Sequence, residues 1–310
     1  MEINPETIRR LAFIKYFFQF AREQSKLPSP QNYLSILMFH DSVELFLHLS
    51  AESLGANLTN ISFLGYFTKI NKELKGIELS QKTSMDKLNR ARVSLKHKGL
   101  YPNPDDIDYF RVSTQAFFEE NCPIVFGIEF AEISLLNLIQ DEEVRKDLEN
   151  AQNEFENGHF KESLEKIAIA FHILLENYEK NKKVYELSPF RIGVDLDREM
   201  RLESSTYGYT DNRPSYYLIK TVQKIQEVLK IILLNIDYRK YLKFRLLTPD
   251  NVIYAKGVKF STMWLSGRDK MDFKREDVEY CINFVIESAL KLQEFDFEID
   301  KKYFLYSFFS

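Results

Sequence analysis

Long stretches with helical spacing of apolar residues, separated by short polar breaks, dominate the hydrophobic pattern of this chain. In the first part they cover residues 5–23, 31–54, 60–74, 83–98 and 105–121, and residues 124–140 are expected to continue as an apolar helix or an extended segment. Asn4 followed by Pro5 predicts the start of the first helix. Gly55 predicts the end of the second helix, Gly99 that of the fourth, and Pro123 that of the fifth.

The rest of the chain has a similar pattern after a charged stretch that begins at Asp141. Helices are predicted over 142–157, 159–180, 215–236 and 275–295. Residues 241–264 alternate only weakly, which predicts at most a short β-hairpin near 245–262. The expected fold class is therefore all-α, a helical bundle in two helical halves, with domains at 1–140 and 141–310.

Composition narrows the picture in three ways. The 310 residues carry a net charge of −4, so any contact with nucleic acid must come from a local basic patch. Two isolated cysteines fit neither a disulfide framework nor a zinc site and suit a reducing cytoplasm. Neither a secretory leader nor an apolar run of membrane-spanning length is recognisable, so a cytoplasmic protein without a membrane partner is expected.

The first predicted helix has more apolar residues than a single stripe needs, which predicts that it is covered by other elements on two sides.

The candidate catalytic motif lies in residues 84–104. This stretch is predicted to be a short cationic helix that ends at Gly99 and is followed by two prolines. Arg92 and His97 stand there with four residues between them. This R-x4-H pattern, with Asn89 before it and a Pro-rich exit after it, resembles the HEPN family of all-helical, metal-independent ribonucleases. The resemblance implies an RNA endonuclease of toxin or phage-defence type that acts as a homodimer and leaves 2′,3′-cyclic phosphate ends.

Arginine and histidine are suited to metal-free RNA cleavage. A histidine can exchange protons near neutral pH, and an arginine offers a planar cation that matches a phosphate. On an ideal helix Arg92 and His97 point about 140° apart, so either the helix ends between them or the site is composite. Asn89, Arg92 and Lys96 share a side more closely, and Arg90 and Lys98 complete a basic patch for RNA phosphates.

Polar residues in the second predicted helix are candidates for supporting roles. Asp41, Glu44 and His48 lie on one side of that helix by spacing, and a salt bridge from Asp41 or Glu44 is expected to orient the Arg92 guanidinium. His40 and His48 are expected to be core histidines. No metal site and no cofactor are predicted, because neither the spacing of these residues nor any thiolate suggests one.

Four observations keep other interpretations open. Val93 follows Arg92 where the HEPN motif commonly has a polar residue, and this favours a non-catalytic HEPN-like module that binds RNA or a protein partner such as an antitoxin. Arg92 and His97 also fit a plain helix end, where basic residues interact favourably with the helix dipole. The second half echoes the first as a degenerate repeat without the motif, and the mild acidity fits a scaffold that does not contact RNA.

Overall fold

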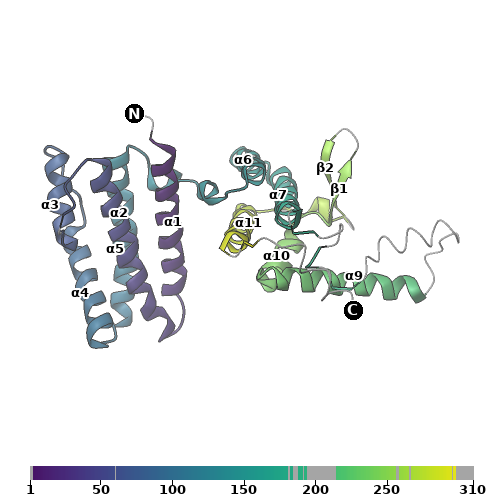
Figure 1. The fold of residues 1–310 in the computed structure, drawn as a ribbon, viewed down its shortest axis with the longest axis horizontal. Coiled ribbons are helices and arrows are strands. Elements are labelled where there is room, and N and C mark those ends of the chain that lie inside the picture. Colours follow the sequence, from purple (N-terminus) through teal and green to yellow (C-terminus); the bar gives the residue numbers. More distant parts are fainter. Residues whose placement is uncertain are drawn as a thin grey trace. The chain divides into compact units, whose positions relative to one another are not determined.

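The computed structural model describes residues 3–59, 61–180, 182–183, 188–190, 192–193, 214–255, 258–264, 267–294 and 296–297. They fold as an all-α protein with ten α-helices and one two-stranded antiparallel sheet, which confirms the predicted fold class (Figure 1). The chain forms two compact units, Met1–Leu138 and Ile139–Ser310. No helix in the described part of the chain is long and apolar enough to cross a membrane.

The first unit is a bundle built around one apolar helix, α2. That helix packs against α1, α3, α4 and α5. Its buried positions repeat at three- and four-residue intervals, so it contacts neighbours on more than one side. The elements of the unit are α1 (Pro5–Ser25), η1 (Gln31–Tyr33), α2 (Leu34–Ser53), α3 (Phe63–Glu73), α4 (Lys82–Lys98), α5 (Pro104–Phe126), η2 (Phe130–Glu132) and η3 (Leu135–Leu138).

Phenylalanine rings form the core of this bundle. Phe118 on α5 is fully buried. Its ring is stacked on Phe130 at a centroid distance of 4.6 Å and lies 5.1 Å from Phe18 of α1 and 5.5 Å from Phe46 of α2. Because aromatic rings bury large areas and interact edge to face, this cluster connects three helices and the segment after α5.

Local signals predicted several helix ends correctly. The Asn4 side chain accepts a hydrogen bond from Glu6 N–H and begins α1. Gly99, with φ of 63°, ends α4 in the left-handed conformation that glycine adopts most easily. The start of α4 has no side-chain cap, because Gln81 occupies the N-cap position with φ of 61° and its side chain makes no capping hydrogen bond.

Two predictions for this unit were wrong. Helix α5 does not end at Pro123 but continues through it to Phe126. The proline removes a hydrogen bond to the carbonyl of Glu119, whose residue is exposed and so reachable by water, and the helix ends one turn later in any case. Helix α1 is not covered on two sides either, since Phe13 and Phe20 remain 49% and 50% exposed.

Asn121 is fully buried on α5 and connects that helix to the start of α4. Its Oδ1 accepts a hydrogen bond from Ser80 N–H at 2.9 Å, and its Nδ2 donates to the Phe117 carbonyl at 2.7 Å. The side chain thereby fixes the turn from which the motif helix begins.

Replacing Asn121 by leucine is expected to lower the free energy of unfolding by about 1–3 kcal/mol, because the partly buried Ser80 N–H and the Phe117 carbonyl both lose a side-chain partner. Urea denaturation followed by circular dichroism measures the change. Gln115→Leu, on the same helix but paired only with Glu119 at the surface, is the control and is expected to change stability by about 0.5 kcal/mol or less. Equal effects of both changes would contradict the role assigned to Asn121.

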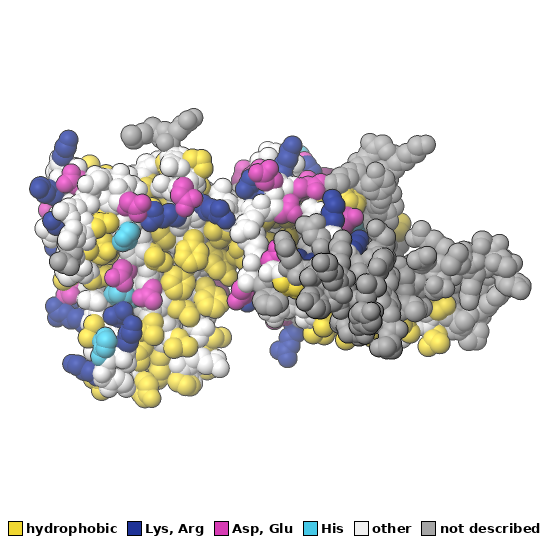
Figure 2. Space-filling model, viewed as in Figure 1, with side chains coloured by type: hydrophobic (Ala, Val, Ile, Leu, Met, Phe, Trp, Pro, Cys, Tyr) yellow, Lys and Arg dark blue, Asp and Glu magenta, His cyan; other side chains and the backbone are white. Residues whose placement is uncertain are grey.

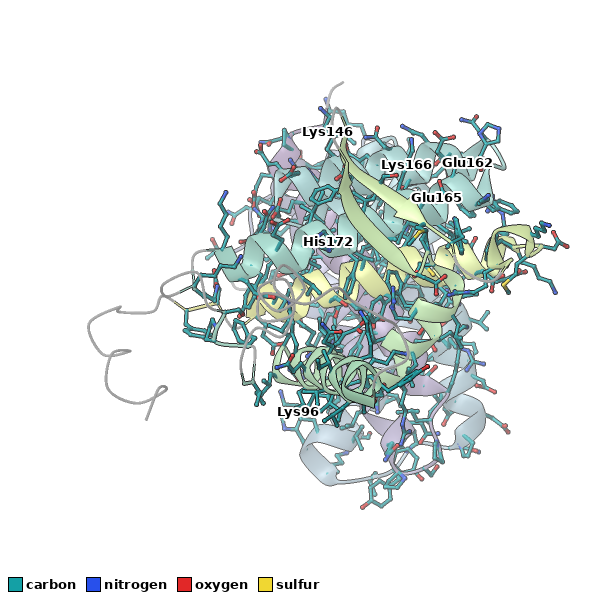
Figure 3. The ribbon with its side chains drawn as sticks, turned by 90° about the vertical axis from the view of Figure 1, so that its right-hand side faces the viewer. Lys96, Lys146, Glu162, Glu165, Lys166 and His172 are labelled. Carbon is teal, nitrogen blue, oxygen red and sulfur yellow. The ribbon has the colours of Figure 1, made fainter. Side chains whose placement is uncertain are left out.

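The second unit contains α6 (Glu142–Glu156), α7 (Phe160–Lys180), α9 (Pro214–Leu233), α10 (Tyr238–Leu247), β1 (Asn251–Ala255), β2 (Val258–Met263), η4 (Arg268–Lys270) and α11 (Arg275–Glu294). The hairpin β1–β2 is present where the sequence predicts it. Helix α10 was missed, although the Asp237 side chain caps it by accepting from Lys240 N–H. Glu165 and His172 lie on α7 along the hairpin (Figure 3), where Glu165 accepts a 2.7 Å hydrogen bond from Trp264.

Candidate functional site

Arg92 and His97 lie on the last two turns of α4, as the motif predicts. Arg92 is half-buried and His97 is exposed. The helix is stopped just beyond them, where Gly99 N–H bonds to the Leu95 carbonyl and Leu100 N–H bonds to the Ser94 carbonyl, each at 3.2 Å. These two hydrogen bonds therefore fix the helix end at which the motif lies.

The helix does not end between Arg92 and His97. Since α4 is helical through Lys98, five residues of regular helix separate the two side chains and they diverge by about 140°. Of the two arrangements that the sequence allowed, the one with a break in the helix is wrong. If both side chains act on one phosphate, groups from elsewhere must complete the site.

The basic residues of the motif are available at the surface. Lys96 and Lys98 are exposed beside His97, and no ion pair with a described residue involves Arg92, Lys96, His97 or Lys98. Arg90 is exposed too, but its guanidinium pairs with Asp86 at 2.6 Å. Figure 2 shows Lys, Arg and His side chains together at the end of the first unit where α4 terminates in Figure 1.

Asp41 and Glu44 do not orient Arg92, which corrects the predicted salt bridge. Within the described residues neither carboxylate forms an ion pair with the guanidinium. Both face His40 instead, with Asp41 Oδ1 at 3.3 Å and Glu44 Oε2 at 3.8 Å from His40 Nδ1. The two carboxylates are half-exposed on the outer side of α2.

His40 was expected to be a core histidine, and it is 2% exposed, but it is more than a packing residue. Its Nε2 lies 3.1 Å from Asn89 Oδ1 on α4, and its ring is stacked on Phe63 at a centroid distance of 4.5 Å. Asn89 therefore contacts α2 rather than standing free beside Arg92. His48, also expected in the core, is 47% exposed and lies 3.7 Å from Glu52.

Both cysteines are buried away from the surface. Burial raises the pKa of Cys122 to about 12 and raises the pKa of Cys281 further, which disfavours the thiolate form that thiol chemistry uses. Among the residues that the structure describes, His40, Asp41 and Glu44 form a group whose possible metal-ligand atoms lie within 4.8 Å of one another. The side of the helix predicted from spacing included Asp41 and Glu44 but not His40.

Comparison with known proteins gives no independent guide to the site. The chain matches no protein-family model, no curated protein and no solved structure at a significant level. The motif residues and their geometry are therefore what bears on function.

Proposed function

We propose that this chain is a metal-independent RNA endonuclease of the HEPN type, with a composite active site formed by a homodimer. Its products would carry 2′,3′-cyclic phosphate ends. Such an activity suits a cytoplasmic toxin or phage-defence enzyme. An antitoxin or another regulatory protein would restrain it.

The observation that carries the proposal is the accessibility and orientation of Arg92 and His97 at the end of α4. Both side chains are accessible, neither is in an ion pair within the described part of the chain, and regular helix turns them apart. A single chain can therefore place either Arg92 or His97 against one phosphate, but not both. Two copies of α4 facing each other would offer two of each around one phosphate.

The chemistry assigned to these residues follows from their side chains. His97 would take the ribose 2′-OH proton as a base, and the second His97 would protonate the leaving 5′-oxygen as an acid. Arg92 would stabilise the negative charge that builds on the phosphate during attack. Lys96 and Lys98, exposed on the same end of the helix, would attract the flanking phosphates, with Arg90 as a further cation.

Apolar side chains around the motif support a homodimer. Leu100 and Tyr101, on the loop directly after α4, are 58% and 74% exposed. Side chains of this kind are favourable at an interface between two copies, and a twofold axis would bring the same patch of both chains together. Such an axis would also bring the two motif helices close to each other.

Cleavage in the presence of EDTA tests the proposal. The full chain is incubated with total tRNA and with a generic single-stranded RNA, its oligomeric state is measured by light scattering, and the product ends are analysed. We expect dimers and 2′,3′-cyclic phosphate ends in EDTA. Folded, dimeric protein that cleaves neither RNA would overturn the nuclease assignment.

One observation favours a second function, a non-catalytic HEPN-like module that binds RNA or a protein partner. Val93, directly after Arg92, is 36% exposed and apolar where a polar residue commonly accompanies the motif. A binding module would shift the mobility of RNA, or of a partner, without producing new ends. The same incubations analysed on native gels distinguish the two functions.

A further inference from the structure

We propose that His40, Asp41 and Glu44 form a binding site for a divalent transition-metal cation of the Zn²⁺ class on the outer side of α2. This inference does not depend on the proposed nuclease activity, and the cation is given no part in cleavage. It arises from the contacts of one buried histidine.

The distances in the cluster fit a small metal ion. Zinc binds imidazole nitrogen and carboxylate oxygen at about 2.0–2.2 Å, so its ligand atoms in a tetrahedron are about 3.3–3.6 Å apart. His40 Nδ1 is 3.3 Å from Asp41 Oδ1 and 3.8 Å from Glu44 Oε2. All three ligand atoms lie within 4.8 Å of one another, which is wider than a tetrahedral edge, and the two half-exposed carboxylates can move inward to close the difference.

The other nitrogen of His40 has the partner that a metal-binding histidine requires. Asn89 Oδ1 lies 3.1 Å from Nε2, so the tautomer with its hydrogen on Nε2 can donate to it. In that tautomer the Nδ1 lone pair is directed at the two carboxylates. A cation bound between the three groups stabilises this arrangement, as the hydrogen bond on the far side of a metal-binding histidine does.

The surroundings fix the ring in this orientation. His40 is 2% exposed, and its ring is stacked on Phe63 with an interplanar angle of 26°. A ring held on one face and hydrogen-bonded at Nε2 cannot easily turn its Nδ1 away from the acids. The donor is thus pre-oriented, which lowers the cost of ordering the site when an ion binds.

The donor set selects the kind of ion. One imidazole nitrogen and two carboxylate oxygens suit first-row divalent metals, while Mg²⁺ and Ca²⁺ prefer oxygen ligands alone. Zinc should bind more tightly than manganese, following the general order of affinities. Three protein ligands leave a fourth position on the exposed side for water.

The test is a titration of the full chain with Zn²⁺, after EDTA treatment and desalting, followed by isothermal calorimetry. We expect saturable binding at this site, weakened at least tenfold by Asp41→Asn and by Glu44→Gln. Asn89→Leu should weaken it by about 10- to 100-fold, as loss of a hydrogen bond to a metal-binding histidine usually does. Mg²⁺ at the same concentrations should give no saturable binding.

His48→Gln is the matched control. His48 and Glu52 repeat the four-residue spacing of His40 and Glu44 on the same helix, but His48 is exposed and Glu52 pairs with Arg10. This variant should bind Zn²⁺ within twofold of wild type. Circular dichroism checks that every variant is folded. Absence of saturable binding, or equal affinity of wild type and the Asp41 and Glu44 variants, would overturn the proposal and leave a proton as the charge between the three groups.

Discussion

Replacing His97 by alanine is expected to reduce RNA cleavage by about 10²- to 10⁴-fold, the usual contribution of a general acid or base. His97 is exposed on the last turn of α4, so removing its ring leaves no cavity. The loss should therefore appear in kcat with little change in stability. Initial rates on a labelled single-stranded RNA in EDTA measure the effect.

Arg92→Ala is expected to reduce cleavage by about 10²- to 10³-fold, because charge building on the phosphate loses its stabilising partner. Arg92→Lys should recover only part of this loss, since a lysine keeps the charge but not the planar fork. Lys72→Ala, which removes an exposed cation from α3 in the same unit, is the control for charge alone and should stay within twofold of wild type. If the Arg92 and His97 variants cleave as fast as wild type, the motif is not the active site.

The largest expected effect on stability comes from Phe118→Ala. Phe118 is fully buried and contacts rings from α1, α2 and the segment after α5. Truncating a buried phenylalanine costs about 3–5 kcal/mol through lost burial and the cavity that remains. Since folded domains are stable by only about 5–15 kcal/mol, this change should remove a large fraction of the first unit's free energy of unfolding.

Urea denaturation followed by near-ultraviolet circular dichroism measures this loss. Phe13→Ala provides the control, because Phe13 is an exposed phenylalanine of α1 and should cost about 1 kcal/mol or less. Because the chain folds as two compact units, the transition of the first unit is to be resolved before free energies are compared. Equal midpoints for the two variants would contradict the central position of Phe118.

The features that the sequence predicted correctly are the ones that local chemistry determines. Asn4 and Gly99 mark helix ends through hydrogen bonds and dihedral angles within a few residues of themselves. The same local reasoning stopped α5 at Pro123, because the rule against proline ignores that an exposed carbonyl can turn to water. Helix α10 was missed because its apolar pattern is weak, although Asp237 was a usable start signal.

The candidate site shows a different limit of prediction from sequence, which concerns contacts between helices. The motif was found because Arg92 and His97 stand at a recognisable spacing in one helix. The surroundings of His40 were not found, because Asn89 lies 49 residues further along the chain and meets it only when α2 packs against α4. Asp41 and Glu44 approach His40 within α2 itself, and the His40–Glu44 pair has the i, i+4 spacing that a sequence can show. Periodicity within one helix tells which residues share a side, but not which residue of another helix lies opposite.

The exposed phenylalanines of α1 have a practical consequence that concerns salt. In Figure 2 a broad apolar area covers the first unit on the side of α1, away from the basic end of α4. Sulfate strengthens association through apolar surface, whereas salt in general weakens binding of phosphates to Lys and Arg. Ionic conditions therefore act in opposite directions on these two surfaces of one bundle. A buffer chosen to keep the protein from associating through α1 is also the one in which any affinity for RNA is greatest.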